Sequence, residues 1–268
     1  MLLREVEYAR PSSVDEAVRL LGSNDGARVL AGGQTLVNVM KARAAAPDVL
    51  VDVAKLDELR SIGLSGETLQ IGAMATYTQI MTSSEVEVSR PILAEVCGQI
   101  ADVQVRNRGT IGGNVCSNDP TNHLPPLMVA LGAEMAILSS GGERVVSAEE
   151  FFLGVYMTAA GPGDLLTQIR IPAGRGDAFE AITLGADGTC IVSAAASVSG
   201  GGVRVALGCV DAVPVLVTSV AADEQAVRSA VRDAALEPPG DVHASSEYRR
   251  HLAEVVAVRA VQSASGRS

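Results

Sequence analysis

The 268-residue sequence contains no tryptophan and only 3% aromatic residues, so it lacks the stacking platforms on which proteins hold single-stranded bases. Positive charge is also scarce, since 21 Lys and Arg residues face 31 Asp and Glu residues and give a net charge of −10. A nucleic-acid binder must neutralise phosphates with clustered Lys and Arg, and anionic membrane surfaces attract the same residues. The composition therefore argues against both partners.

Long hydrophobic runs are missing as well. No apolar run approaches the roughly 20 residues that a membrane-spanning helix needs. Near the N-terminus, Glu5 and Glu7 stand where a secretory signal peptide would have an apolar stretch. We therefore expect a cytoplasmic protein without a membrane span. The 47% of hydrophobic residues still allow a sizeable core or two modest ones.

Cysteine is sparse and unpaired in sequence. Cys97, Cys116, Cys190 and Cys209 form no C-x-x-C pair, the spacing typical of zinc and iron–sulfur sites, so we predict no metal centre within this chain. We expect the four thiols to be small buried hydrophobes in a reducing compartment. No Ser-His-Asp set and no pair of carboxylates is a candidate for acid–base catalysis, and we predict no catalytic residue.

The first fifty-odd residues alternate between helical and strand patterns. Ser13 and Glu16 have the spacing of a capping box before an apolar helical repeat, which predicts a helix over about 13–22. A strand over 28–31 leads into a second helix, and a buried strand follows over 49–53. This alternation is typical of a small parallel sheet.

From about residue 60 the pattern changes. We predict a strand over 68–73, a helix over 92–100, a hairpin of strands 134–138 and 144–146, and a strand over 165–171 ended by Pro172. The stretch 102–126 is rich in Gly, Asn, Asp and Pro, and we expect it to be irregular. A long irregular segment inside a domain is more often functional than not.

A glycine-rich stretch over 173–177 predicts a boundary between domains. Beyond it we expect a hairpin of strands 190–198 and 203–210 around Gly200, Gly201 and Gly202, then helices over 223–236 and 245–261. The tail from Ser263 is expected to be disordered.

Two glycine pairs fit the needs of a diphosphate. Glycines have no Cβ, reach positive φ freely and can point successive backbone N–H groups into one concavity. Gly32 and Gly33 lie between a predicted strand and a predicted helix, where the helix dipole adds positive charge, and Thr35 adds a hydroxyl donor.

The second pair, Gly112 and Gly113, repeats this arrangement between Thr110 and Asn114. Taken singly, a Gly-Gly pair is more often a tight turn than a ligand site. Neither pair belongs to a GxGxxG or GxxxxGK[ST] motif, so neither a Rossmann site nor a P-loop is indicated.

The wider sequence around both pairs, residues 31–36, 106–114 and 119–120, resembles the FAD subunit of molybdenum hydroxylases. That is the medium subunit of aerobic carbon monoxide dehydrogenase and of its xanthine-dehydrogenase-like relatives. Further similar segments are 47–52, 71–73 with Thr76, 124–125 and 188–195.

This resemblance implies an α+β protein with an FAD-binding fold of the vanillyl-alcohol-oxidase/PCMH type. The implied FAD-binding domain, 1–172, has a small parallel α/β subdomain over about 1–56 and a mixed or antiparallel α+β subdomain over 57–172. A C-terminal domain of antiparallel sheet and helices would span 173–262, before a tail of 263–268.

The resemblance also implies non-covalent FAD with its diphosphate on the two glycine segments. The residues implied to contact it are Ala31, Gly32, Gly33, Gln34, Thr35, Leu36, Ala73, Thr76, Thr110, Gly112, Gly113, Asn114, Asp119 and His123.

Two positions depart from the family's pattern. His123 stands where the family usually has an acid that binds ribityl or ribose hydroxyls, and Ala181 stands where a lysine is common. His123 is therefore open to two interpretations, a hydrogen bond to the cofactor, which Asn122 could also make, or a plain loop histidine. Arg106 and Arg108 are similarly open, either as loop anchors or as residues that face a partner subunit.

The function implied is that of an electron-transfer subunit. A large partner subunit would carry the molybdenum cofactor, a small partner subunit would carry [2Fe-2S] clusters, and FAD in this chain would pass electrons to a terminal acceptor. The resemblance implies a dimer of such heterotrimers. Two alternatives are a self-sufficient FAD-dependent oxidoreductase and a scaffold that has lost FAD. The substrate of the complex and its terminal acceptor cannot be read from this chain.

Overall fold

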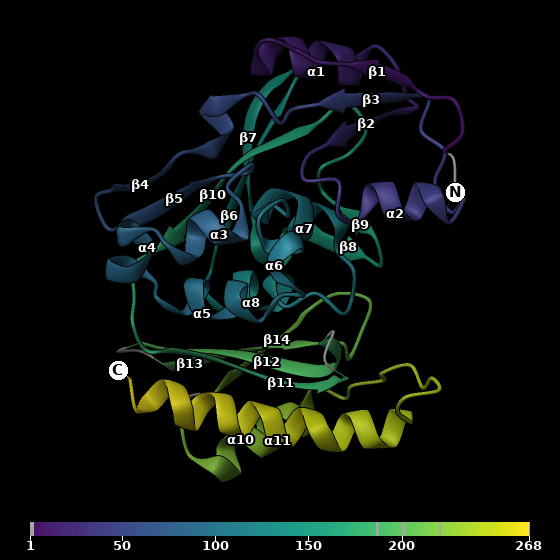
Figure 1. Ribbon diagram of the computed structural model, residues 1–268. Helices are drawn as coiled ribbons and strands as arrows, with labels where there is room; N and C mark the ends of the chain where they lie inside the picture. The colour runs from purple at the N-terminus through teal and green to yellow at the C-terminus, as the bar shows by residue number, and fades with distance from the viewer. Residues whose placement is uncertain (1–2, 186–187, 200–201, 220, 268) are drawn as a thin grey trace.

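The computed structural model describes residues 3–185, 188–199, 202–219 and 221–267. Three sheets follow one another along the chain, and Figure 1 shows them from top to bottom. The first is a parallel sheet of order β1-β3-β2, the second is antiparallel with order β4-β5-β10-β6-β7, and the third is antiparallel with order β11-β12-β13-β14. The predicted α+β class and the small parallel sheet are confirmed.

The N-terminal unit packs one helix against its parallel sheet. Its elements are β1 (Glu7–Ala9), α1 (Val14–Gly22), β2 (Ala27–Leu30), α2 (Leu36–Lys41) and β3 (Val49–Asp52). Buried Ala17, Val18 and Leu21 of α1 cover Val51 of the central strand β3. Strand β1 was not predicted.

The capping box predicted for α1 is only half formed. Ser13 caps the helix by accepting a hydrogen bond from the Glu16 backbone N–H at 3.2 Å. The Glu16 carboxylate, however, accepts from the backbone N–H and the hydroxyl of Ser12, each at 2.7 Å, and not from Ser13. The helix start is therefore as predicted, but the Glu16 side chain bonds to Ser12, one residue before the N-cap residue Ser13.

The central unit supplies most of the core. Before the glycine-rich stretch it contains η1 (Asp57–Arg60), β4 (Ile62–Ser65), β5 (Thr68–Gly72), α3 (Tyr77–Met81), α4 (Ser84–Ser89) and α5 (Ile92–Gln99). After it come β6 (Glu134–Ser139), β7 (Gly142–Ser147), α9 (Ala148–Phe151), β8 (Phe152–Gly154), β9 (Met157–Thr158) and β10 (Leu165–Pro172). The predicted strand, helix and hairpin of this region are confirmed, whereas β4 was missed.

The stretch 102–126 is not irregular, and that prediction is wrong. It contains α6 (Val103–Arg106), α7 (Ile111–Ser117) and the first turn of α8 (Leu124–Ala130). Asp102 and Thr110 cap the first two helices, and the prolines of α8 stand in its first turn, where a missing N–H costs nothing. Gly112 and Gly113 therefore belong to the first turn of a helix.

The C-terminal unit consists of β11 (Asp177–Leu184), β12 (Thr189–Ser199), β13 (Gly202–Gly208), β14 (Val215–Ser219), α10 (Glu224–Asp233) and α11 (Ser246–Ser265). The predicted hairpin is confirmed as β12 and β13, although Gly200 and Gly201 of its turn lie outside the described residues. Helix α11 continues to Ser265, so the tail expected from Ser263 is wrong, because Val261 and Ala264 are buried.

Figure 1 shows how the third sheet is covered on both faces: α10 and α11 lie below it, and α8 lies above it. Through α8 the core of the central unit reaches Phe179, Ala195 and Ala206 of this sheet. The C-terminal sheet is thereby held against α8, the helix that follows α7 in the chain. Within the described part of the chain, every helix is too short or too polar to cross a bilayer.

Candidate functional site

The first glycine segment, residues 31–36, joins β2 to α2. Gly33 has a φ of 73°, a left-handed conformation that favours glycine. The Gln34 side-chain amide donates to the Gly32 carbonyl at 3.2 Å and fixes the turn. Among the described residues, none accepts a hydrogen bond from the backbone N–H groups of Gly32, Gly33, Gln34 and Thr35. These four donors are available to a ligand.

The two glycine segments pack against each other although 80 residues of sequence separate Gly32 from Gly112. A Cβ on Gly32 would overlap the Arg108 carbonyl oxygen, and a Cβ on Gly113 would lie 3.8 Å from the Cβ of Ala31. Gly32 therefore permits a close approach of backbone to backbone, whereas the contact at Gly113 is an ordinary van der Waals contact. The fold brings the two predicted halves of the cofactor site together.

The second glycine segment, residues 110–114, uses its N–H groups within the protein. Ile111 donates to the Ala75 carbonyl at 3.0 Å, Gly112 donates to the Ala73 carbonyl at 2.9 Å, and Gly113 donates to the Thr110 hydroxyl at 3.1 Å. Free N–H groups were the reason for expecting this pair to bind a diphosphate, so that reason does not hold in this geometry. The role that remains for Gly112 is close packing, since a Cβ added at this position would lie 2.6 Å from the Ala73 carbonyl oxygen.

Ala73 and Thr76 join this segment from the strand side. Thr76 caps α3 in a complete capping box with Gln79, and it pairs with Thr110 in an isolated antiparallel bridge. The Tyr77 N–H donates to the Gly109 carbonyl at 3.2 Å and extends the pairing. Ala73 and Thr76 are thus brought to the second glycine segment, as the prediction requires.

Asn114 offers an unused acceptor at this place. Its side-chain N–H₂ donates to the Tyr77 hydroxyl at 3.0 Å, while its Oδ1 is buried without a partner among the described residues. Burial raises the pKa of Tyr77 well above its usual value, so this hydroxyl stays protonated. An unpaired buried oxygen costs free energy unless a donor reaches it, and a cofactor hydroxyl would be such a donor.

His123, at the start of α8, is 6% exposed, so its interpretation as a surface histidine is wrong. Its ring centroid lies 5.0 Å from that of Phe179 on β11, and its Nδ1 is buried with no partner among the described residues. Asp119, four residues earlier, accepts from Thr121 at 2.8 Å and from the Tyr156 hydroxyl at 3.1 Å. Asp119 therefore fixes its own loop, whereas His123 keeps an unused nitrogen.

The two arginines near the second segment differ. Arg106 donates to the carbonyls of Ile100 and Ala101 at 2.9 and 2.7 Å, which favours its interpretation as a loop anchor. The Arg108 side chain is exposed, so it stays available to a partner.

Sequence reasoning missed a pair of cysteines near this site. The thiols of Cys190 on β12 and Cys209 after β13 contact each other, and both line a cavity of about 390 Å³ together with Pro120 and Thr121. The pairing register of the predicted hairpin could have revealed this pair. Because Ser193 pairs with Gly208, the two cysteines fall near the same end of that hairpin.

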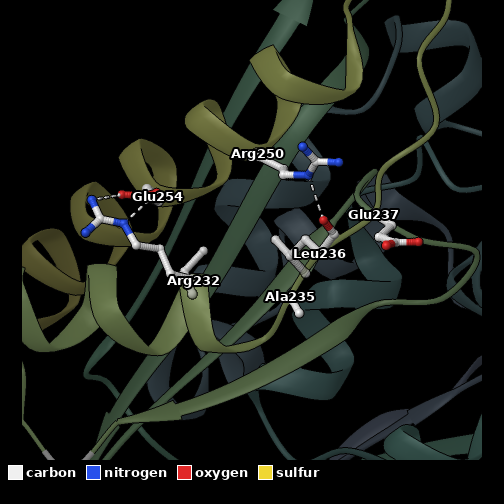
Figure 2. Close-up of a pocket in the computed structure, with 7 residues that line it drawn as sticks. Arg232, Ala235, Leu236, Glu237, Arg250 and Glu254 are labelled. Carbon is white, nitrogen blue, oxygen red and sulfur yellow. Dashed lines mark hydrogen bonds and ion pairs between the residues drawn. The ribbon is translucent and has the colours of Figure 1, made fainter.

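A second cavity, of about 280 Å³, lies between α10 and α11 (Figure 2). Arg232 there donates to Glu254 at 2.8 and 3.0 Å, and Arg250 donates to the Leu236 carbonyl at 2.8 Å. Arg232, Glu254 and Arg250 are thus engaged within the protein. In the described part of the chain, no cluster of three His, Cys, Asp or Glu side chains has a metal-binding arrangement.

Comparisons with known proteins agree with this geometry. The family described as the FAD binding domain in molybdopterin dehydrogenase matches residues 4–174. The chain is 37% identical to the carbon monoxide dehydrogenase medium chain of Afipia carboxidovorans, over 100% of this chain and 99% of that one. It is 32% identical to the glyceraldehyde dehydrogenase medium chain of Sulfolobus acidocaldarius, over 96% of this chain and 97% of that one. A chain of the crystal structure of Cu,Mo-CO dehydrogenase aligns with a TM-score of 0.94 and 36% identity over 100% of both chains.

Proposed function

This chain belongs to the family that carries the FAD binding domain in molybdopterin dehydrogenase, and we propose that its first glycine segment holds the diphosphate of FAD, with the second segment as its support. The chain is the FAD-carrying, electron-transferring subunit of a multi-subunit molybdenum hydroxylase. The molybdenum cofactor and the iron–sulfur clusters are carried by partner subunits.

The observation that carries the site assignment is the set of four unpartnered N–H groups from Gly32 to Thr35. Backbone N–H groups in one concavity bind phosphate without lysine, which suits a chain of net charge −10. Ala31 and Leu36 border this concavity. The donors there number four, and a diphosphate presents several anionic oxygens, so the residues present fit the group.

The second segment has a supporting role in this proposal. Gly112 lets α7 approach Ala73 closely, and Thr110 and Thr76 fix that approach. Asn114 Oδ1 and His123 Nδ1 are the two buried polar atoms left for the hydroxyls of the cofactor. His123 would thereby take over the hydrogen bond of the acid that is usual at its position.

FAD, when bound, supplies the redox chemistry, because it accepts electrons singly and releases them in pairs. The chain's own residues bind and orient it. We propose no catalytic acid or base among them.

We further propose that the complex is a dimer of heterotrimers in the cytoplasm, a location supported by four free cysteines. We also propose domain limits of 1–172 and 173–262. Helix α11 requires the second limit to move to at least residue 265. The mass of the complex in solution and fractionation of the source cells test the assembly and the location.

The test of the function is to express the chain with its natural neighbouring genes, purify it through a tag on this subunit, and record a visible spectrum. Flavin and iron–sulfur absorbance with two further subunits is the expected result. A yellow chain that turns over a substrate alone would favour an independent flavoenzyme. A colourless chain that cannot be reconstituted with FAD would contradict the proposal.

A further inference from the structure

Cys190 and Cys209 come from neighbouring strands and meet at one end of the C-terminal sheet. Cys190 is the second residue of β12, and Cys209 follows the last residue of β13 with a φ of 64°. This left-handed conformation is rare for a residue with a side chain, and it re-aims the Cys209 thiol as β13 ends. The two thiols lie close enough to each other to interact electrostatically.

The S–H hydrogen of Cys209 has two acceptors within reach, the Pro120 carbonyl oxygen at 3.0 Å and the sulfur of Cys190. A thiol donates only one hydrogen. When Cys190 is ionised, the hydrogen turns to its sulfur, because hydrogen bonds to a charged acceptor are the stronger ones.

The surroundings favour the ionised form of Cys190 and the protonated form of Cys209. The neighbouring Cys209 thiol, and to a smaller degree His123, lower the pKa of Cys190 against desolvation. The hydrogen bond to Cys190 and burial raise the pKa of Cys209. Arg249 and Asp119 act on Cys209 with opposite signs, and Asp211, Asp241 and His243 are the other ionisable groups that line the cavity.

Both sulfurs are accessible to a small molecule because Cys190 and Cys209 line the cavity of about 390 Å³. Val155 of the exposed hairpin between β8 and β9 and Thr121 of the loop before α8 form part of the same wall. The two side chains themselves belong to residues that are only 3% and 8% exposed, so a large reagent is excluded. Cys97, in contrast, is 0% exposed and lines neither cavity.

We propose that Cys190 and Cys209 form a reactive dithiol site for small disulfides, with Cys190 as the nucleophile and Cys209 as the resolving thiol. The contact of the two thiols in the wall of the cavity carries this inference. It requires no FAD and goes beyond electron transfer by this subunit.

The exchange balances as two substitutions at sulfur. The Cys190 thiolate attacks one sulfur of a disulfide R–S–S–R, its S–S bond breaks, and one R–S⁻ leaves while a mixed disulfide forms on Cys190. Cys209 then loses its proton to solvent and attacks the Cys190 sulfur, and the second R–S⁻ leaves. Two protein thiols are oxidised to one disulfide, and one small disulfide is reduced to two thiols.

The first experiment needs no variant. The purified complex, with and without bound FAD, is treated with iodoacetamide at a series of pH values, and the cysteines of this chain are followed by peptide mass spectrometry. We expect Cys190 to react at least about 100-fold faster than Cys97 at pH 6, because the thiolate is the nucleophile. Its rate should persist well below pH 9, the ordinary pKa of a thiol, because the pKa of Cys190 is lowered. Equal rates for Cys190 and Cys97 would overturn the proposal.

The second experiment uses 2-hydroxyethyl disulfide as the small disulfide. The wild-type chain should lose two hydrogen atoms in mass and lose two alkylatable thiols, while Cys209→Ser should accumulate a mercaptoethanol adduct on Cys190. Cys190→Ser should form neither product, and Cys97→Ser is the matched control that should behave as the wild type.

An unmodified Cys209→Ser chain, in a complex that keeps its circular dichroism and its flavin absorbance, would contradict the nucleophilic role of Cys190. An adduct that accumulates equally in the wild type would contradict the resolving role of Cys209. Because flavin absorbance is recorded separately, failure of this proposal is distinguishable from failure of the proposed FAD site.

Discussion

Gly32 lies at the point where the two glycine segments touch, and a side chain there has no room. Its Cβ would overlap the Arg108 carbonyl oxygen, a backbone atom that cannot rotate away. We predict that Gly32→Ala forces the segments apart, costs about 1–3 kcal/mol of unfolding free energy as an overpacked contact does, and lowers the FAD content of the purified subunit. Urea unfolding and the ratio of flavin to protein absorbance measure the two effects.

Gly63 on β4 provides the matched control. A Cβ at Gly63 meets no atom within 4 Å, so Gly63→Ala should leave FAD content unchanged. Equal FAD content in the Gly32→Ala and Gly63→Ala proteins would show that contact between the segments does not shape the cofactor site.

Cys97 of α5 gives a pH dependence whose sign follows from burial. Desolvation raises its pKa from 9.0 to about 12 in the folded state. Below pH 9 the thiol keeps its proton in both states. Above pH 9 the unfolded chain loses this proton while the folded chain keeps it, so ionisation stabilises the unfolded state. The thiol's contribution to stability is therefore lost as the pH rises.

The expected size is about 1.4 kcal/mol between pH 7 and pH 10, because the unfolded thiol is then one unit above its pKa. Urea unfolding gives the unfolding free energies of the wild type and of Cys97→Ala at both pH values. The difference between the two proteins should shrink by this amount from pH 7 to pH 10. A difference that is the same at pH 7 and pH 10 would mean that the unfolded state does not gain this ionisation.

Thr110 caps α7, the helix that carries the second glycine pair. Its hydroxyl accepts from the Gly113 N–H at 3.1 Å in a site that is 2% exposed. We predict that Thr110→Val removes the cap from this N–H, costs about 1–2 kcal/mol as the loss of an N-cap does, and weakens FAD binding. Thr110→Ser should retain most of both properties.

Ser13 provides a control that separates loss of stability from weaker FAD binding. It caps α1 by accepting the same kind of hydrogen bond, from the Glu16 backbone N–H at 3.2 Å. Ser13→Ala should lower the unfolding free energy by a similar amount, measured with urea, and leave the FAD dissociation constant unchanged. Weaker FAD binding by the Ser13→Ala protein would mean that general loss of stability, and not the α7 cap, controls the cofactor.

The same elements show what the sequence could predict. Strong periodicity predicted α1, α5, α11 and the hairpin of β6 and β7. The missed strands β1, β4, β11 and β14 all lie at the edges of their sheets, where one side of the strand has no partner and the hydrophobic signal is weak. Helix α7 was missed because glycine and asparagine have low helix propensity, and packing against Ala73 overrides it.

At the scale of the whole molecule, the sequence could name the site residues but not their contacts. The resemblance predicted both glycine segments, yet only the fold shows that Gly32 packs on Arg108 and that Ala73 accepts from Gly112. The burial of His123 beside Phe179 could not be predicted either, because it depends on how the C-terminal sheet rests on α8. Contacts across such distances in sequence are set by packing rather than by any local pattern.

The placement of the C-terminal sheet depends on a buried ion pair at its first residue. Arg90, at the end of α4, donates to Asp177 at 2.5 Å and to the Pro172 carbonyl at 2.5 Å, and the Gly174 N–H donates to the Ser89 carbonyl at 3.0 Å. The side chains of Arg90 and Asp177 are 7% and 1% exposed. The pair therefore ties the connection between the two units to the central one.

Removing one partner leaves the other charge buried without compensation. We predict that Asp177→Asn lowers the unfolding free energy by about 3–5 kcal/mol and that the double variant Arg90→Met with Asp177→Leu regains most of it. Limited trypsin digestion after Arg175 reports the same change locally, since Arg175 is held by a hydrogen bond to the Val88 carbonyl at 2.9 Å. Because Phe179 of this sheet packs against His123, Asp177→Asn should also lose FAD more readily on gel filtration. An Asp177→Asn protein with wild-type stability and wild-type resistance to trypsin would mean that the apolar contacts of α8, and not this ion pair, hold the sheet in place.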